Sequence, residues 1–132
     1  MSDESAPEHP PGNSLYVTIS NAIVGLMREY TGRGPTKART TLRDNLVVVL
    51  LEHTLSKGEQ VLVEKGRGEN VLALRREYQE AIREEASTKI AEITGRKVLA
   101  MMSANHLDPD LAVELFVLDG PPENHALAAA SP

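Results

Sequence analysis

Residues 31–52, TGRGPTKARTTLRDNLVVVLLE, hold a glycine-proline corner that leads into a predicted β-hairpin. Pro35, the last residue of this corner, prevents a helix from continuing, because proline lacks an amide hydrogen and keeps the preceding residue extended. Residues 36–42 then alternate in polarity, residues 43–45 form a turn signal, and residues 46–51 are all aliphatic. An aliphatic run on both faces is typical of a central strand that is buried on two sides.

One amphipathic helix is predicted before the corner. Apolar side chains recur from Leu15 to Tyr30 at spacings of three and four residues, which places them on one helical face. Asn13 or Ser14 is suited to cap the start of this helix. Gly32 is suited to its end, because glycine readily adopts the left-handed conformation that follows many helices.

Two further helices are predicted after the hairpin. Ser56 and Glu59 form the pattern of a capping box, which begins a short helix with Val61 and Leu62 turned inward. A long helix over residues 70–94 follows, with a charged outer face that includes both arginines 75 and 76. Its expected apolar stripe consists of Val71, Leu74, Tyr78, Ile82, Ala86, Ile90 and Ile93.

A second hairpin completes the expected fold. Residues 96–105 and 111–118 both alternate as strands do, and a proline-containing turn separates them. The order α-β-β-α-α-β-β predicts an α+β fold, a two-layer sandwich with a mainly antiparallel four-stranded sheet. We expect a single domain over residues 13–119, with disordered tails at 1–12 and 120–132 because these segments offer little to bury.

Composition limits the classes of function. The chain has 132 residues, no cysteine and a net charge of −5. Residues 1–12 and 119–132 carry five acidic residues and no Lys or Arg, so residues 13–118 are neutral, which argues against general nucleic-acid binding. No apolar run approaches the roughly 18 residues of a membrane span, and the N-terminus lacks the features of a signal peptide. These features favour a soluble cytoplasmic protein.

The basic corner is the candidate binding site. Arg33, Lys37, Arg39 and Arg43 follow Gly32 without an intervening acid, so this segment is suited to an anion, a phosphate or a partner's carboxylates. With such a site the protein would be a small anion- or nucleotide-binding regulatory domain. The alternative is a helix stop followed by an edge strand whose cations protect it from aggregation. The candidate residues are Gly32, Arg33, Gly34, Pro35, Lys37, Arg39, Arg67, Arg75 and Arg76.

No pattern in the sequence indicates catalysis, a cofactor or a metal. The glycines of the corner follow a helix and precede a strand, unlike those of a phosphate-binding P-loop. His106, Asp108 and Asp110 are the only local group of metal-ligand types, and a polar turn explains them equally well. We therefore expect a protein that is not an enzyme.

The aliphatic strands predict a homodimer. If the helices lie on one side of the sheet, the opposite face would expose residues from 46–51 and 111–118. Soluble monomers rarely expose a contiguous apolar patch of several hundred Å². Either the first helix covers this face or a second copy of the chain does, and two-fold symmetry makes the second copy the commoner solution.

The chain also resembles a known family. GRGPTKAR at 32–39, the aliphatic strand, Ser56-x-x-Glu59, Thr94-Gly95 and the closing VELFVL at 113–118 together resemble the Na+-translocating membrane-potential-generating system C family of small bacterial proteins. The resemblance spans roughly residues 14–119. It implies a small residue, often glycine, at the position of His53.

The resemblance implies an association with a sodium- or potential-linked membrane system. It carries no biochemical activity that can be assigned to particular residues. A chain without a membrane span would then be a soluble accessory or regulatory protein, with a possible protein partner at a membrane complex.

Overall fold

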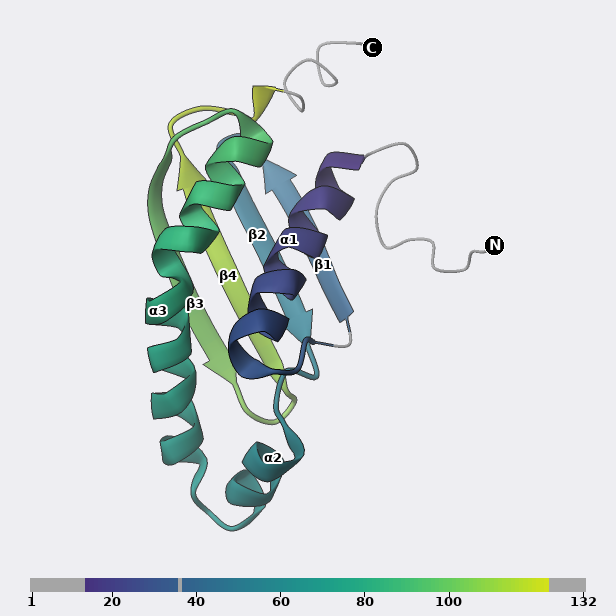
Figure 1. The fold of residues 1–132 in the computed structure, drawn as a ribbon, viewed down its shortest axis with the longest axis vertical. Coiled ribbons are helices and arrows are strands. Elements are labelled where there is room, and N and C mark those ends of the chain that lie inside the picture. Colours follow the sequence, from purple (N-terminus) through teal and green to yellow (C-terminus); the bar gives the residue numbers. More distant parts are fainter. Residues whose placement is uncertain (1–13, 36, 124–132) are drawn as a thin grey trace, which may run out of the picture.

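The computed structural model describes residues 14–35 and 37–123. It confirms the predicted α+β fold and the order of its elements (Figure 1). The expected tail at 1–12 and the end of the second tail, 124–132, lie outside the described residues. The elements are α1 (Ser14–Thr31), β1 (Lys37–Arg43), β2 (Leu46–Glu52), α2 (Lys57–Glu64), α3 (Gly68–Thr94), β3 (Val98–His106) and β4 (Leu111–Leu118).

The four strands form one antiparallel sheet in the order β1-β2-β4-β3. Asp44 and Asn45 make the turn between β1 and β2, with Asp44 at a φ of 54°. Asn45 also ties this hairpin to the end of β4, since its side chain donates to the Leu118 carbonyl at 2.9 Å. The hairpin β1-β2 and the hairpin β3-β4 are therefore joined through β2 and β4, the two central strands.

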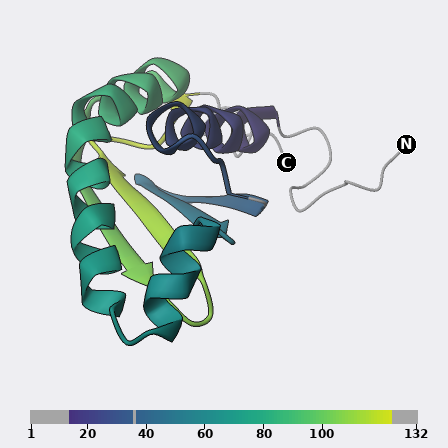
Figure 2. The same cartoon turned by 60° about the horizontal axis from the view of Figure 1, so that its bottom comes forward.

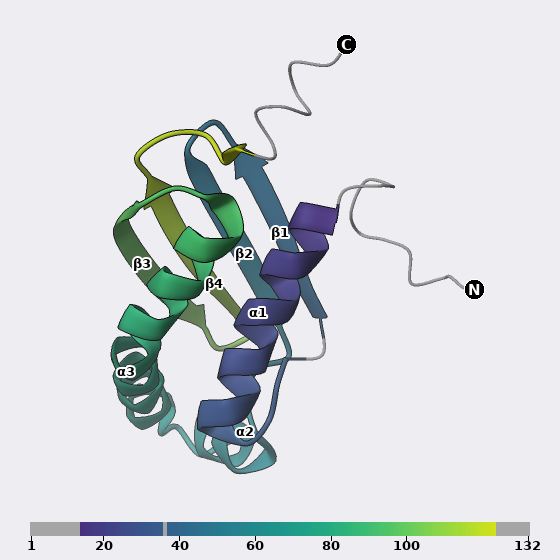
Figure 3. The ribbon, with the colours of Figure 1, turned by 45° about the horizontal axis from the view of Figure 1, so that its top comes forward.

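Both long helices pack on the same face of the sheet, with the four strands behind them in Figures 1 and 3. Alternation along β2 and β4 turns every second side chain toward these helices. The resulting core joins Ile19 and Ile23 of α1 to Ile82 and Ala86 of α3 across the strands. Its completely buried strand residues are Val47, Val49, Leu51, Phe116 and Leu118.

Two details of the predicted helices are wrong. Val61 and Leu62 of α2 are 42% and 37% exposed, because α2 lies beyond the end of the sheet and buries none of its residues (Figure 2). On α3, Leu74 is 43% exposed, whereas Arg75 and Gln79 are buried in its place. Gln79 faces Asn105 and Glu114 on the sheet, and Arg75 faces the Thr54 carbonyl and Glu59, so both buried polar residues meet polar partners.

The described fold extends a few residues past β4. Arg96 donates to the carbonyl of Pro121, and the Asp119 amide donates to the Lys97 carbonyl at 2.9 Å. Pro122 is buried. Residues 120–123 of the expected tail are thus in contact with the domain.

Candidate functional site

The sheet face opposite the helices carries a continuous set of partly exposed apolar side chains. Within the described chain, no helix or loop packs over this face, which we call the open face. Strand register aligns its side chains in rows across the sheet, such as Arg39, Leu50, Val113 and Ala104. Its apolar members are Leu46, Val48 and Leu50 of β2, Leu111, Val113, Leu115 and Val117 of β4, and Ala100, Met102 and Ala104 of β3.

The open face is large for a chain of this size. Its strands have seven to nine residues, and the most exposed of its large apolar side chains, Met102, is 53% accessible. With a rise of about 3.3 Å per residue and a strand spacing of about 4.8 Å, the four strands cover roughly 500 Å². Three of these strands carry the apolar side chains, and contiguous apolar patches of several hundred Å² are often functional.

The prediction that the aliphatic strand is buried on two sides is therefore only half met by the chain itself. Val47, Val49 and Leu51 are completely buried, while Leu46 and Leu50 on the other face remain partly exposed. Helix α1 does not cover the second face, since its buried side chains belong to the same core as those of α3. The sheet needs a partner from outside the described chain to bury both faces.

Cations line one margin of the open face. Lys37, Arg39 and Arg43 lie on β1 with exposed side chains directed to the same side as the aliphatic rows. Arg39 also forms an ion pair with Glu52 at 3.6 Å. Two candidate site residues, Lys37 and Arg39, are thus placed on the sheet margin rather than in a pocket at the corner.

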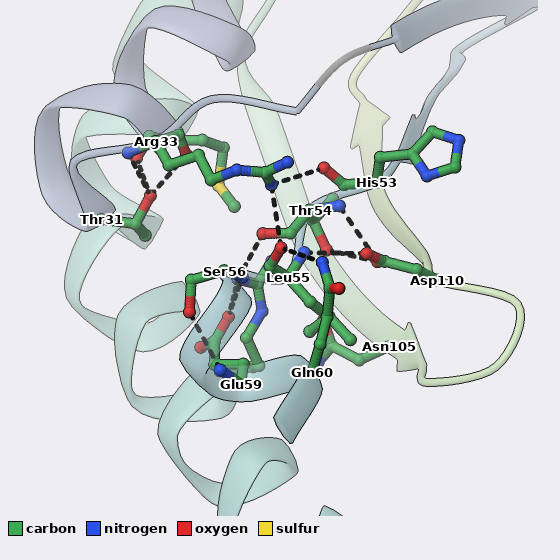
Figure 4. Close-up of polar contacts among 12 residues, drawn as sticks. Thr31, Arg33, His53, Thr54, Leu55, Ser56, Glu59, Gln60, Asn105 and Asp110 are labelled. Atoms are coloured by element: carbon green, nitrogen blue, oxygen red, sulfur yellow. Dashed lines mark hydrogen bonds and ion pairs between the residues drawn. The ribbon is translucent and has the colours of Figure 1, made fainter. Parts of the chain in front are cut away.

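Arg33 has a structural role at the corner (Figure 4). Gly32 ends α1 with a φ of 77°, and its amide donates to the Arg28 carbonyl at 2.8 Å, as expected for a helix-ending glycine. The next residue, Arg33, donates through one guanidinium nitrogen to the carbonyls of His53 and Leu55, at 2.8 and 2.9 Å. The corner is therefore bonded to the loop between β2 and α2.

Asp110 holds the same loop from the turn between β3 and β4. Its carboxylate accepts hydrogen bonds from the Thr54 amide and hydroxyl, at 3.0 and 2.9 Å, and from the Leu55 amide at 2.9 Å. The predicted capping box is confirmed immediately afterwards, with Ser56 and Glu59 bonded reciprocally (Figure 4). His53 begins this loop at a φ of 58°, a left-handed conformation that favours glycine.

The remaining candidate residues lie in different parts of the fold. Gly34 lies beside the Arg28 side chain, and Pro35 is buried. Arg67 precedes α3 and Arg76 lies on it, both exposed, whereas Arg75 is buried with only 2% of its surface accessible. The structure does not gather the nine residues into one cluster, and anion binding at the corner stays a prediction.

A buried polar network, which sequence reasoning missed, connects α3 to the sheet. Glu114 is completely buried on β4 and accepts from the Gln79 side-chain amide at 3.2 Å and from the Ser103 hydroxyl. Gln79 and Asn105 exchange two further hydrogen bonds, at 3.0 and 2.9 Å. Burial raises the pKa of the Glu114 carboxyl, while the bonds from Ser103 and Gln79 and the positive charge of Arg75 act in the opposite direction.

Arg75 extends this network toward the loop held by Asp110. Its guanidinium donates to the Thr54 carbonyl at 3.4 Å and lies 3.7 Å from the Glu59 carboxylate. One terminal nitrogen, Nη2, is buried and has no hydrogen-bond partner in the part of the chain that the structure describes. Arg75 therefore supports the interior and the loop and is not accessible to an outside anion.

A groove of about 470 Å³ lies between α2 and the turn that joins β3 to β4. The Asp110 carboxylate is already bonded to the loop, and His106 Nδ1 lies 2.8 Å from the Pro109 carbonyl oxygen. Across residues 14–35 and 37–123, no three His, Cys, Asp or Glu side chains are grouped so as to hold a metal ion. The groove is lined by His53, Leu55, Gln60, Val63, Glu64, Leu107, Asp108, Pro109 and Asp110.

Comparison with known proteins supports the resemblance seen in the sequence. The model of the family described as "Na+-translocating membrane potential-generating system (MpsC)" matches residues 13–120. An uncharacterized protein, YrhF of Bacillus subtilis (strain 168), is 26% identical over 103 residues, which cover 76% of this chain and 84% of that protein. No solved structure gives a significant match. Among the described helices, none has the length and apolar character needed to cross a bilayer. Because the family model spans most of its length, the chain belongs to the Na+-translocating membrane potential-generating system (MpsC) family.

Proposed function

We propose that this protein is a non-enzymatic accessory or regulatory component of a Na+-translocating, membrane-potential-generating system, and that it works in the cytoplasm as a homodimer. The open face is the observation that carries the proposal. It presents ten apolar side chains with a basic margin and no covering element from the described chain. Such a surface is suited to binding a protein.

The buried polar network around Glu114 also supports a binding role. The Glu114 network links α3 to the central strand β4 and the edge strand β3, so this half of the sheet is held at several points. A rigid scaffold lowers the entropy lost when a surface is buried in a complex. The family description supplies the link to Na+ translocation.

Anion binding at the corner has less support as a function. Arg33 is committed to two loop carbonyls and Arg75 is buried, which leaves Lys37 and Arg39 on the sheet margin as the nearest exposed candidates. Inorganic phosphate should therefore cause little thermal stabilisation. A stabilisation that Lys37→Gln with Arg39→Gln removes would favour the anion-binding function instead.

Recovery of the native complex from cells tests the proposed function. The full chain is purified from membrane and soluble fractions kept apart, and its partners are identified by mass spectrometry. We expect a second copy of the chain in both fractions and a Na+-transporting membrane protein in the membrane fraction. Recovery of the chain alone and monomeric from both fractions would contradict the proposal.

A further inference from the structure

In three neighbouring rows of the open face, the two edge strands carry side chains of opposite size order. Along β1, a long arginine is followed by a short threonine and another long arginine. Along β3, the residues of the same rows are small, long and small. These three rows pair Arg39 with Ala104, Thr41 with Met102, and Arg43 with Ala100 across the sheet. A fourth row, at one end of the face, holds Lys37 and His106 at its two edges and does not follow this order.

Neither sheet edge is well suited to pair with a second copy. Self-pairing of β1 would bring Lys37, Arg39 and Arg43 opposite one another, and like charges directly opposite destabilise a strand pair. At the other edge, the Arg83 guanidinium from α3 donates to the Met101 carbonyl at 2.6 Å. This bond occupies a backbone acceptor that an added strand would need. The open face remains as the contact surface.

Two symmetric arrangements can bring the open faces of two copies together. If the two-fold axis runs along the strands, β1 of each copy lies across β3 of the other. Each row of one copy then faces the same row of the other copy. If the axis runs across the strands, β1 lies across β1, and the rows run in opposite directions. The second arrangement brings Lys37 toward Arg43 of the partner subunit, so two basic margins meet.

We infer that a second copy of this chain covers the open face, with the two-fold axis along the strands and β1 of one copy across β3 of the other. This inference rests on the proposed homodimer and names its geometry. Arg39 and Arg43 then lay their aliphatic stems over Ala104 and Ala100 of the partner subunit, with their charged ends at the solvent-exposed rim. Met102 fills the space over Thr41 of the partner subunit. Long residues meet short ones at each of these three rows.

The buried area lies at the lower end of the range for a dimer. Two faces of roughly 500 Å² would together bury about 1,000 Å², which reaches the lower limit for a biological interface. Packed sheets cross at about 30°, so the edge strands shift along each other by about 4 Å. This shift is smaller than the roughly 6.6 Å between rows, so the pairing of long with short residues is kept.

Site-specific cross-linking tests the arrangement. The chain has no cysteine, so single substitutions create unique thiols. Two full-length variants, Thr41→Cys and Met102→Cys, are treated with a short bis-maleimide cross-linker, each alone and after mixing to allow subunit exchange. Positions 41 and 102 of different copies should lie about 10 Å apart, whereas two copies of position 41 should lie roughly 17 Å apart.

The expected result is a dimer band that appears only in the mixture and includes up to about half of the chains, the share of mixed dimers after random exchange. A dimer band from Thr41→Cys alone would overturn the inferred axis while leaving the proposed homodimer standing. A dimeric mass with no cross-link in the mixture would also overturn the inference. A monomeric mass at micromolar concentration would overturn the inference together with the proposed homodimer, and the membrane partner would still be tested separately by recovery from cells.

Discussion

Arg33 and Asp110 hold one loop from opposite sides. The Arg33 guanidinium donates to the carbonyls of His53 and Leu55, and the Asp110 carboxylate accepts from the amides of Thr54 and Leu55. These two charged groups, about 20 and 55 positions away in the sequence, thereby bond backbone groups of residues 53–55. The His53 amide and the Thr54 carbonyl are bonded to the Asp110 carbonyl and to Arg75. The loop connects β2 to α2, so these bonds determine where the second half of the chain begins.

Arg33→Gln should destabilise the domain. The substitution removes two charge-assisted hydrogen bonds, to the carbonyls of His53 and Leu55, and leaves Leu55 only the bond from Gln60. This loss costs about 1.5–3 kcal/mol in the free energy of unfolding. Urea unfolding followed by circular dichroism measures the loss. The matched control, Lys37→Gln with Arg39→Gln, changes exposed cations of the same basic segment and should stay within about 1 kcal/mol of wild type. Equal losses in both variants would contradict a structural role specific to Arg33.

Glu114→Gln should change how stability depends on pH. Burial raises the pKa of the folded Glu114 carboxyl above its ordinary value of 4.5, so the folded state keeps a proton that the unfolded state releases. Wild-type stability therefore falls as the pH rises from the ordinary to the raised pKa. Glutamine keeps an oxygen acceptor for Gln79 and has no proton to release, so the variant should gain stability relative to wild type over this window.

Urea unfolding between pH 4 and pH 8 measures that difference. Glu77→Gln is the control, because Glu77 is an exposed residue on the same helix, α3. A difference between wild type and Glu114→Gln that stays constant over the whole pH range would contradict the raised pKa.

His53→Gly should be more stable than His53→Ala. His53 has a φ of 58°, a conformation that costs a residue with a Cβ about 1–2 kcal/mol and costs glycine little. Glycine adds back some entropy to the unfolded chain, so we expect a net advantage of about 0.5–1 kcal/mol over alanine. Thermal unfolding of the two variants gives the comparison. Greater stability of His53→Ala would indicate that the backbone strain at position 53 is small.

Much of the fold could be predicted because local signals and tertiary packing agree. The glycine at 32, the capping box at Ser56 and the alternation along 111–118 each depend on short-range chemistry, and each appears in the structure where expected. The family resemblance also rested on these short segments, and the family match confirms it.

The interior of α3 could not be predicted from helical periodicity. Periodicity placed Leu74 inward, but Arg75 and Gln79 are buried. Gln79 bonds to Glu114 on β4, and Arg75 bonds to the Thr54 carbonyl and pairs with Glu59. The available signal was Glu114 itself, which lies on the same face as Ala112 and Phe116 in an otherwise apolar strand. A single acid on the core-facing side of a strand indicates a polar partner, although the sequence does not reveal which helix supplies it.

The candidate binding site was divided for a similar reason. Arg33, Lys37 and Arg39 are close in sequence, but the direction of each side chain depends on the loop and sheet that it meets. Arg33 reaches a loop twenty residues ahead, whereas Lys37 and Arg39 follow the pleat of β1. Side chains adjacent in sequence therefore serve different surfaces, and only the three-dimensional arrangement separates them.

The mass of the native chain in solution is the most direct test of the open face as a dimer contact. Light scattering behind a sizing column, at micromolar concentration, should give the mass of two chains. Met102→Glu places a charge on the open face and should give the mass of one chain with an unchanged circular dichroism spectrum. Leu74→Glu is the matched control, since Leu74 is 43% exposed on α3 and Met102 is 53% exposed on β3, and this variant should remain dimeric. A single-chain mass for the native protein, or a dimer that survives Met102→Glu, would contradict the open face as the contact between two copies.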